Sequence, residues 1–194
     1  NKKRLKRSVA RCNDYEGERT FCVGVVGLLA SALVNHLGGE TTRGIVSSCY
    51  GDLSFIQALC QILAAWIILS TLLYLAARLL SKSKIRMIDL YGTQLLARIA
   101  LFPVLLLGAL SPLRSAALQL TKTSPEELAA HFPIGLIAFG FTALICLVWF
   151  FLWSYRGYAV AANLKGWKAV VSYMVCYLLA EIIGGLCTAW IAQW

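Results

Sequence analysis

Five long stretches of the chain are almost entirely apolar, and polar segments separate them. The stretches run from Phe21 to Leu37, Phe55 to Leu80, Ile88 to Leu110, Phe132 to Tyr155 and Trp167 to Trp190. A helix needs about 20 apolar residues to cross the ~30 Å hydrocarbon core of a bilayer. The pattern therefore predicts an all-α fold: a polytopic bundle of five transmembrane helices, residues 21–194, preceded by a basic arm, residues 1–20.

The first stretch is the weakest of the five, because it is short and follows a basic segment. With the small residues Ala30-Ser31-Ala32 it also resembles a signal peptide with a cleavage site. Three acidic residues, Asp14, Glu16 and Glu18, interrupt the basic segment, which favours a retained span. Since the sequence begins at Asn1 rather than Met, we expect native residues to precede it.

Composition agrees with this class: 59% of the residues are apolar, 14% are charged and the mean hydropathy is +0.72. The charges are also uneven. Of 18 Lys and Arg residues, 14 lie in the amino-terminal arm and in the second-to-third and fourth-to-fifth connections, whereas only Arg43, Arg114 and Lys122 lie in the other connections. The positive-inside rule then predicts a cytoplasmic amino terminus, an external carboxyl terminus and an odd number of spans.

This topology accounts for most of the net charge of +9. The basic arm is expected to contact anionic lipid headgroups rather than nucleic acid, because no nucleic-acid-binding pattern accompanies it. The seven cysteines have no C-x-x-C spacing and are interpreted as small apolar residues.

Two features concern the ends and faces of the helices. Asp52 is predicted to cap the second span, and Ser124-Pro125-Glu126-Glu127 predicts a short outer helix. Small residues recur on one face of the first span and of the last span, which permits close helix contact in lipid, either within the domain or in a homo-oligomer. These residues are Gly24, Gly27 and Ser31, and Ala180, Gly184 and Thr188.

The strongest functional signal is a pair of charges inside the spans, Arg98 and Glu181. Arg98 follows Arg86 by 12 residues and Glu181 follows Lys168 by 13, so each lies roughly 18–20 Å from the same membrane surface. Intramembrane charges carry an insertion cost and usually pair or line a polar path. We predict a contact between Arg98 and Glu181, which serves either to fix helix register or to relay a proton or substrate.

The third span carries further polar signals around Arg98. Pro103 cannot donate a hydrogen bond to the Ile99 carbonyl, which predicts a kink and a free acceptor next to Arg98. Thr93 and Gln94 extend the polarity into a seam along this helix.

Enzymatic motifs are missing from the sequence. It has no H-E-x-x-H, G-x-S-x-G, P-loop or G-x-G-x-x-G pattern, and its two histidines lie far apart. No catalytic residue, metal ligand or cofactor is therefore predicted.

Two segments resemble bacterial members of the Yip1 family. One is KIRMIDLYGTQLLAR, from Lys84 to Arg98, with Pro103 following, and the other runs from Tyr158 through Asn163 and Gly166 to Glu181 and Ile183. The resemblance covers roughly residues 20–190 and implies a five-span membrane protein without enzymatic activity, in which Asn163 and Gly166 form a turn. Eukaryotic relatives bind small GTPases and membrane-shaping proteins, and some bacterial relatives accompany efflux ABC transporters.

The chain departs from the eukaryotic pattern because its cytosolic segment is short and Asp89-Leu90-Tyr91-Gly92 precedes the third span. Small-GTPase binding is thus not expected. The first functional prediction is an accessory or scaffold subunit for other membrane proteins in a bacterial inner (cytoplasmic) membrane. The alternative is a small transporter or permease subunit that uses Arg98 and Glu181.

Overall fold

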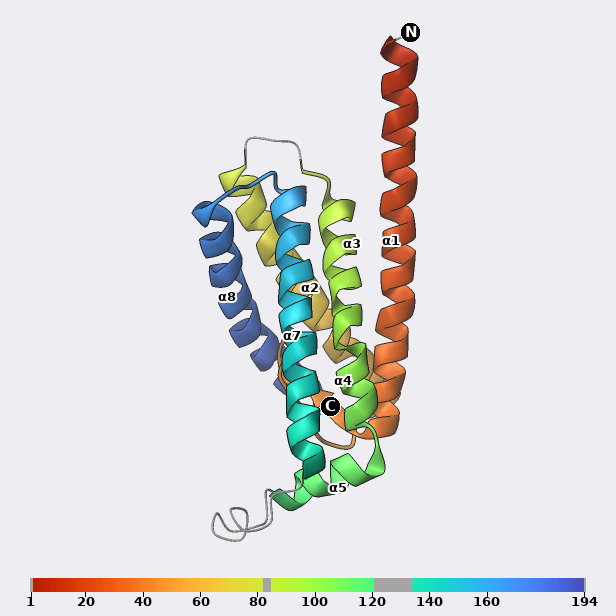
Figure 1. Cartoon of the computed structure of the whole chain (residues 1–194), viewed down its shortest axis with the longest axis vertical. Coiled ribbons are helices and arrows are strands. Elements are labelled where there is room, and N and C mark those ends of the chain that lie inside the picture. Colours follow the sequence, from red (N-terminus) through yellow and green to blue (C-terminus); the bar gives the residue numbers. More distant parts are fainter. Residues whose placement is uncertain (1, 82–84, 121–133, 194) are drawn as a thin grey trace.

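The computed structural model describes residues 2–81, 85–120 and 134–193, with the backbone alone for residues 2–18, 119, 120 and 134. The chain is a bundle of long helices with one small β-hairpin (Figure 1). The elements are α1 (Lys2–Gly38), β1 (Glu40–Thr42), β2 (Ser48–Tyr50), α2 (Phe55–Leu80), α3 (Met87–Ala97), the 3₁₀ helix η1 (Arg98–Leu101), α4 (Phe102–Gly108), α5 (Ser111–Leu120), α7 (Ile134–Ala161) and α8 (Trp167–Ile191).

Five helical segments are long and apolar enough to cross a membrane, as the sequence predicted. They are Arg19–Gly38, Phe55–Leu80, Met87–Gly108, Gly135–Ala161 and Trp167–Ile191. The third segment is the continuous run of α3, η1 and α4. The fourth extends six residues beyond the predicted end at Tyr155, because Arg156 is exposed and does not interrupt the helix.

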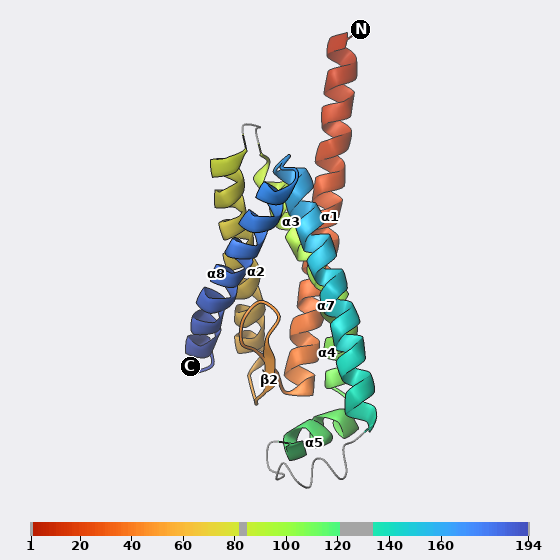
Figure 2. The ribbon, with the colours of Figure 1, turned by 60° about the vertical axis from the view of Figure 1, so that its left-hand side comes forward.

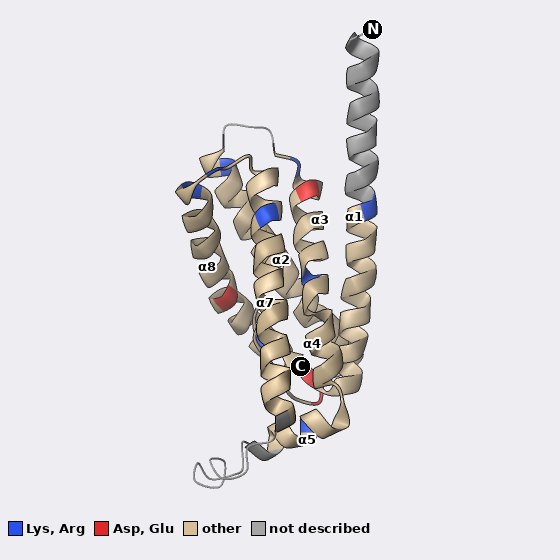
Figure 3. Ribbon diagram, viewed as in Figure 1, with Lys and Arg blue, Asp and Glu red and all other residues tan. Residues whose placement is uncertain are grey.

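The two ends of the bundle differ in charge (Figure 3). We call the end with the β-hairpin and α5 the hairpin end, and the end with the α2–α3 and α7–α8 connections the basic end. Helix α1 extends beyond the basic end (Figure 1). Among the described side chains, Arg78, Arg86, Lys165 and Lys168 lie in or next to the α2–α3 and α7–α8 connections at the basic end, whereas Arg43 lies between β1 and β2 and Arg114 lies in α5, at the hairpin end.

Small residues allow the helices to pack closely. A Cβ atom on Gly24 would lie 2.7 Å from Leu95 Cγ, and one on Gly27 would lie 2.8 Å from Ile99 Cγ1, so α1 and the third span approach closely at these glycines. On α8, Ala180, Gly184 and Thr188 are all buried, and α8 packs mainly against α2. Both small-residue faces are therefore used inside this domain.

The β-hairpin is the main feature that the sequence did not predict. β1 and β2 are antiparallel, with Glu40 opposite Tyr50 and Thr42 opposite Ser48. The connecting loop, residues 43–47, closes with a hydrogen bond from Arg43 N to Ser47 O of 2.8 Å. Figure 2 shows the hairpin between the α2 and α8 pair and the other helices. The tip of this loop, Ile45, is 1% exposed and belongs to the main apolar core.

Helix α2 begins differently from the prediction. Its N-cap is Ser54, which forms a capping box with Gln57, and Asp52 lies upstream and bonds to Arg114 instead. Ser54 suits this position because Gln57, three residues later, can return a hydrogen bond. The predicted outer helix at residues 124–131 lies outside the described residues, and α5 precedes that segment.

Candidate functional site

Arg98 and Glu181 both bond to the backbone of Ile45, which lies in the hairpin loop. Ile45 N donates to Glu181 Oε2 at 2.7 Å, and Arg98 Nη2 donates to Ile45 O at 3.3 Å. Among the described residues, these two side chains make no direct ion pair within 4.0 Å. The predicted direct contact is thus wrong, because one residue of the loop, Ile45, lies between the two side chains.

Two further residues of the hairpin loop, Gly44 and Ser47, lie against the carboxylate of Glu181. Ser47 Oγ also donates to Glu181, to Oε1. A Cβ atom on Gly44 would collide with the same carboxylate, so only glycine allows the loop backbone to approach it this closely. Glu181 therefore accepts hydrogen bonds from two groups of one loop, which provides a donor for each oxygen of this partly buried carboxylate.

The third span breaks at Arg98, as Pro103 predicted, and the break is a 3₁₀ turn between α3 and α4. The Ile99 carbonyl is not free, because Phe102 N donates to it within this turn. The expected second partner for Arg98 is thus wrong, and its observed partner is Ile45 O. The turn starts at Arg98, where helix geometry changes beside the inserted loop.

Thr93 and Gln94 lie on α3, in different surroundings. Gln94 is 1% exposed, and its Nε2 donates to Ser154 O at 3.0 Å, while Tyr173 Oη donates to Ser154 Oγ at 2.9 Å. This network joins α3, α7 and α8. Thr93 Oγ1 donates to Leu90 O of its own helix, so it serves mainly local geometry.

Asn163 and Gly166 form the α7–α8 turn at the basic end. Asn163 has a φ of 50°, Asn163 N bonds Val160 O and Leu164 N bonds Ala159 O, which is the Schellman pattern that ends a helix. Gly166, with a φ of 68°, is the N-cap residue of α8. The turn lies at the opposite end of the bundle from the hairpin (Figure 1).

Sequence reasoning missed a second anchor of the hairpin, Gln61 on α2. Its side chain is 0% exposed, its Oε1 accepts from Thr42 N at 3.1 Å and its Nε2 donates to Thr188 O at 3.1 Å. One amide thereby joins β1, α2 and α8. A glutamine inside an apolar span was the available signal, since a buried amide needs partners for both of its ends.

A cavity of about 70 Å³ lies beside Arg98, between α1, the hairpin, α2, η1 and α4. Apolar side chains, including Leu28, Ile62 and Val104, form part of its wall. Its polar lining consists of Ser31, Asn35, Thr42, Ser47, Ser48 and Arg98.

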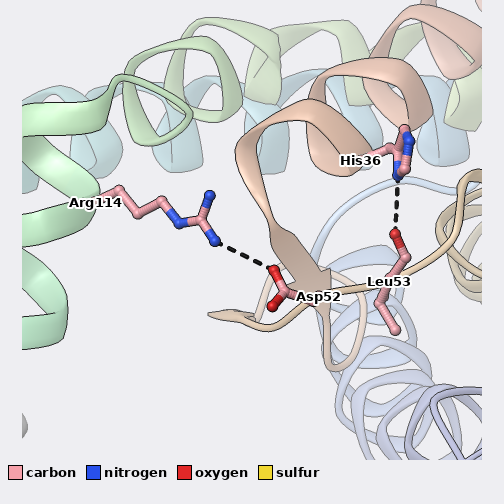
Figure 4. A network of polar contacts seen from close by, with 4 residues as sticks. All are labelled: His36, Asp52, Leu53 and Arg114. Atoms are coloured by element: carbon pink, nitrogen blue, oxygen red, sulfur yellow. Dashed lines mark hydrogen bonds and ion pairs between the residues drawn. The ribbon is translucent and has the colours of Figure 1, made fainter.

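At the hairpin end, polar contacts hold the segment between β2 and α2 against α1 and α5 (Figure 4). Arg114 Nη2 lies 3.3 Å from Asp52 Oδ1, and His36 Nδ1 donates to Leu53 O at 2.9 Å. Asp52 is almost fully exposed, so this ion pair contributes little to stability.

Glu40 and Tyr50, the paired residues of the hairpin, are titratable groups in a partly buried setting. Glu40 is 6% exposed and packs so closely on Gly108 that a Cβ atom there would collide with it. Burial raises the pKa of Glu40 from 4.5 to about 7. The pKa of Tyr50 is also raised, first by burial and then by the charge of Glu40, with Arg114 acting in the opposite direction.

Together these features define a membrane protein built on five apolar helices, in which two intramembrane charges hold an inserted loop. Comparison of the chain with protein-family profiles, with curated proteins and with solved structures finds no match. Within the described residues, no three His, Cys, Asp or Glu side chains are grouped so that they could hold a metal ion.

Proposed function

We propose that this chain is a non-enzymatic integral membrane protein that acts as an accessory or scaffold subunit for other membrane proteins. The observation that carries the proposal is that Arg98 and Glu181 both bond to the backbone of Ile45. A charge that holds backbone in place is committed to structure, whereas a relay group must exchange its partners. The resemblance to bacterial Yip1 proteins supports the same function, with an efflux ABC transporter as the first partner to test.

The proposed partner surface is the outer face of α7, which is the least buried of the five spans. Within the described part of the chain, small residues on this face are exposed, and exposed tryptophans continue the face toward the basic end. The exposed residues are Gly135, Ala138, Ile145, Trp149 and Trp153. In lipid, small residues on an uncovered face favour association with another helix.

Co-purification after gentle detergent extraction tests this function. A stoichiometric membrane-protein partner is expected with the wild-type chain, and Ala138→Trp should remove it while leaving the fold intact. Val175→Trp, at an exposed position on α8, is the matched control and should retain the partner. Recovery of the wild-type chain without any partner, or equal loss in both variants, would contradict the proposal.

The proposed topology places the basic end in the cytoplasm of a bacterial inner membrane, in contact with anionic lipids. The charge difference between the two ends supports this orientation. On a cysteine-free background, Asn163→Cys should resist a membrane-impermeant thiol reagent in intact cells and Ser115→Cys should react. The opposite pattern of labelling would reverse the topology.

A small transporter or permease subunit is the second candidate, and the cavity beside Arg98 is the observation that favours it. Arg98→Leu combined with Glu181→Leu distinguishes the two functions, since it removes both charges from the membrane interior. A folded double variant that keeps its partner and the growth or efflux phenotype supports the scaffold. One that keeps its partner and loses the phenotype supports the transporter.

A further inference from the structure

The cavity beside Arg98 contains polar atoms that no protein group satisfies. Arg98 Nε and Asn35 Oδ1 are both buried and have no hydrogen-bond partner among the described residues, and both residues line the cavity. Asn35 is only 2% exposed, and its Nδ2 already donates to Thr42 Oγ1 at 3.1 Å. Buried polar groups are normally paired, so these two atoms indicate that a molecule in the cavity supplies the missing partners.

The two atoms require opposite partners. Arg98 Nε–H is a donor on the flat edge of a guanidinium, and among the described residues this guanidinium donates through Nη2 to Ile45 O, at 3.3 Å. Asn35 Oδ1 is an acceptor and needs a donor. The carboxylate of Glu181, which accepts from Ile45 N and from Ser47 Oγ, is not within hydrogen-bonding distance of Arg98 Nε.

We propose that this cavity binds a small carboxylate that also carries a hydroxyl group, with the carboxylate on Arg98 and the hydroxyl donating to Asn35. The planar guanidinium matches two carboxylate oxygens, which a spherical anion cannot do. A cavity of about 70 Å³ has space for roughly five water-sized positions, which limits the ligand to about five non-hydrogen atoms. Glycolate has this size and both groups.

This inference goes beyond the scaffold function and does not depend on it. The ligand lies against the hairpin loop through Thr42, Ser47 and Ser48, so binding is expected to stabilise the seated hairpin. Partner co-purification is a separate measurement, and its failure leaves the ligand site unaffected.

The test measures the melting temperature and the binding isotherm of the purified chain in lipid discs, with glycolate, acetate and chloride as probes at equal ionic strength. Glycolate should bind saturably and about tenfold more tightly than acetate, which corresponds to one hydrogen bond, and chloride should have no saturable effect. Asn35→Leu should bring glycolate down to the affinity of acetate, and Arg98→Gln should abolish binding of both.

A larger side chain that fills the cavity tests the proposal without removing any hydrogen-bonding group. Val104 lines the cavity, whereas Leu106, on the same helix, is exposed to the surroundings of the bundle. Val104→Phe should abolish glycolate binding, and Leu106→Phe, the matched control, should leave it unchanged. The proposal is overturned if glycolate shows no saturable effect on the wild-type chain, as expected of a cavity that holds water alone. It is also overturned if chloride matches glycolate or if Val104→Phe binds normally.

Discussion

The hydrogen bonds between the hairpin loop and Glu181 lead to a quantitative prediction. Glu181→Ala removes the acceptor of two hydrogen bonds, from Ile45 N and from Ser47 Oγ. A hydrogen bond to a charged group contributes about 1.5–3 kcal/mol, so the two together give roughly 3–6 kcal/mol. The change also removes the negative charge that faces Arg98 across Ile45, which acts in the same direction.

Further variants show how much each contact contributes to the stability lost in Glu181→Ala. Ser47→Ala removes one of the two hydrogen bonds and should cost about half as much. Gly44→Ala should destabilise the wild-type chain by about 1–3 kcal/mol, because its Cβ collides with the Glu181 carboxylate. In the Glu181→Ala background that collision is gone, so Gly44→Ala should then cost much less.

The assay measures unfolding of the detergent-solubilised chain by a denaturing surfactant, with tryptophan fluorescence as the readout. It compares the wild type, Gly44→Ala, Glu181→Ala and the double variant, which form a double-mutant cycle. A cysteine placed at Val46 on a cysteine-free background reports whether the loop has left its seat, since it should react faster with a thiol reagent in Glu181→Ala. Additive free energies in the cycle, together with unchanged labelling of the loop, would refute the seated-loop arrangement.

Three further predictions concern other contacts. Burial raises the pKa of Glu40 from 4.5 to about 7 in the folded state, so Glu40 contributes up to about 3 kcal/mol to the free energy of unfolding below pH 4.5, and this contribution is lost as pH rises through 7. Glu40→Gln should therefore flatten the profile of stability against pH across this range. Gln61→Leu should cost about 2–4 kcal/mol in surfactant unfolding, since Thr42 N loses its acceptor. Gly157→Ala should lower the stability of the chain by about 1–3 kcal/mol, because the new Cβ atom would lie 2.9 Å from Thr93. Gly140→Ala, where the Cβ atom meets open space, should raise the stability by up to about 1 kcal/mol. Equal effects of the two changes on the melting temperature would contradict this.

The sequence by itself determined the five apolar helices and most of their ends, because the length of an apolar run is a local property set by the thickness of a bilayer. The break at Arg98 was also readable, since Pro103 lacks an amide hydrogen whatever surrounds it. The fixed rise per residue of a helix also predicted that Arg98 and Glu181 lie near each other, and both bond to the backbone of Ile45.

Tertiary structure alone decided what lies between those two charges. The segment Arg43 to Ser47 is short and mixed in composition, and no periodicity in it shows that Ile45 turns inward to the core. Its position depends on contacts with residues more than 50 positions away in the sequence, at Arg98, and 136 away, at Glu181. The start of α2 is a local matter instead, because Ser54 directly precedes Phe55 and forms a capping box with Gln57. Local chemistry determines which segments become helices, whereas the partner of a buried charge depends on which backbone the assembled bundle brings within hydrogen-bonding distance.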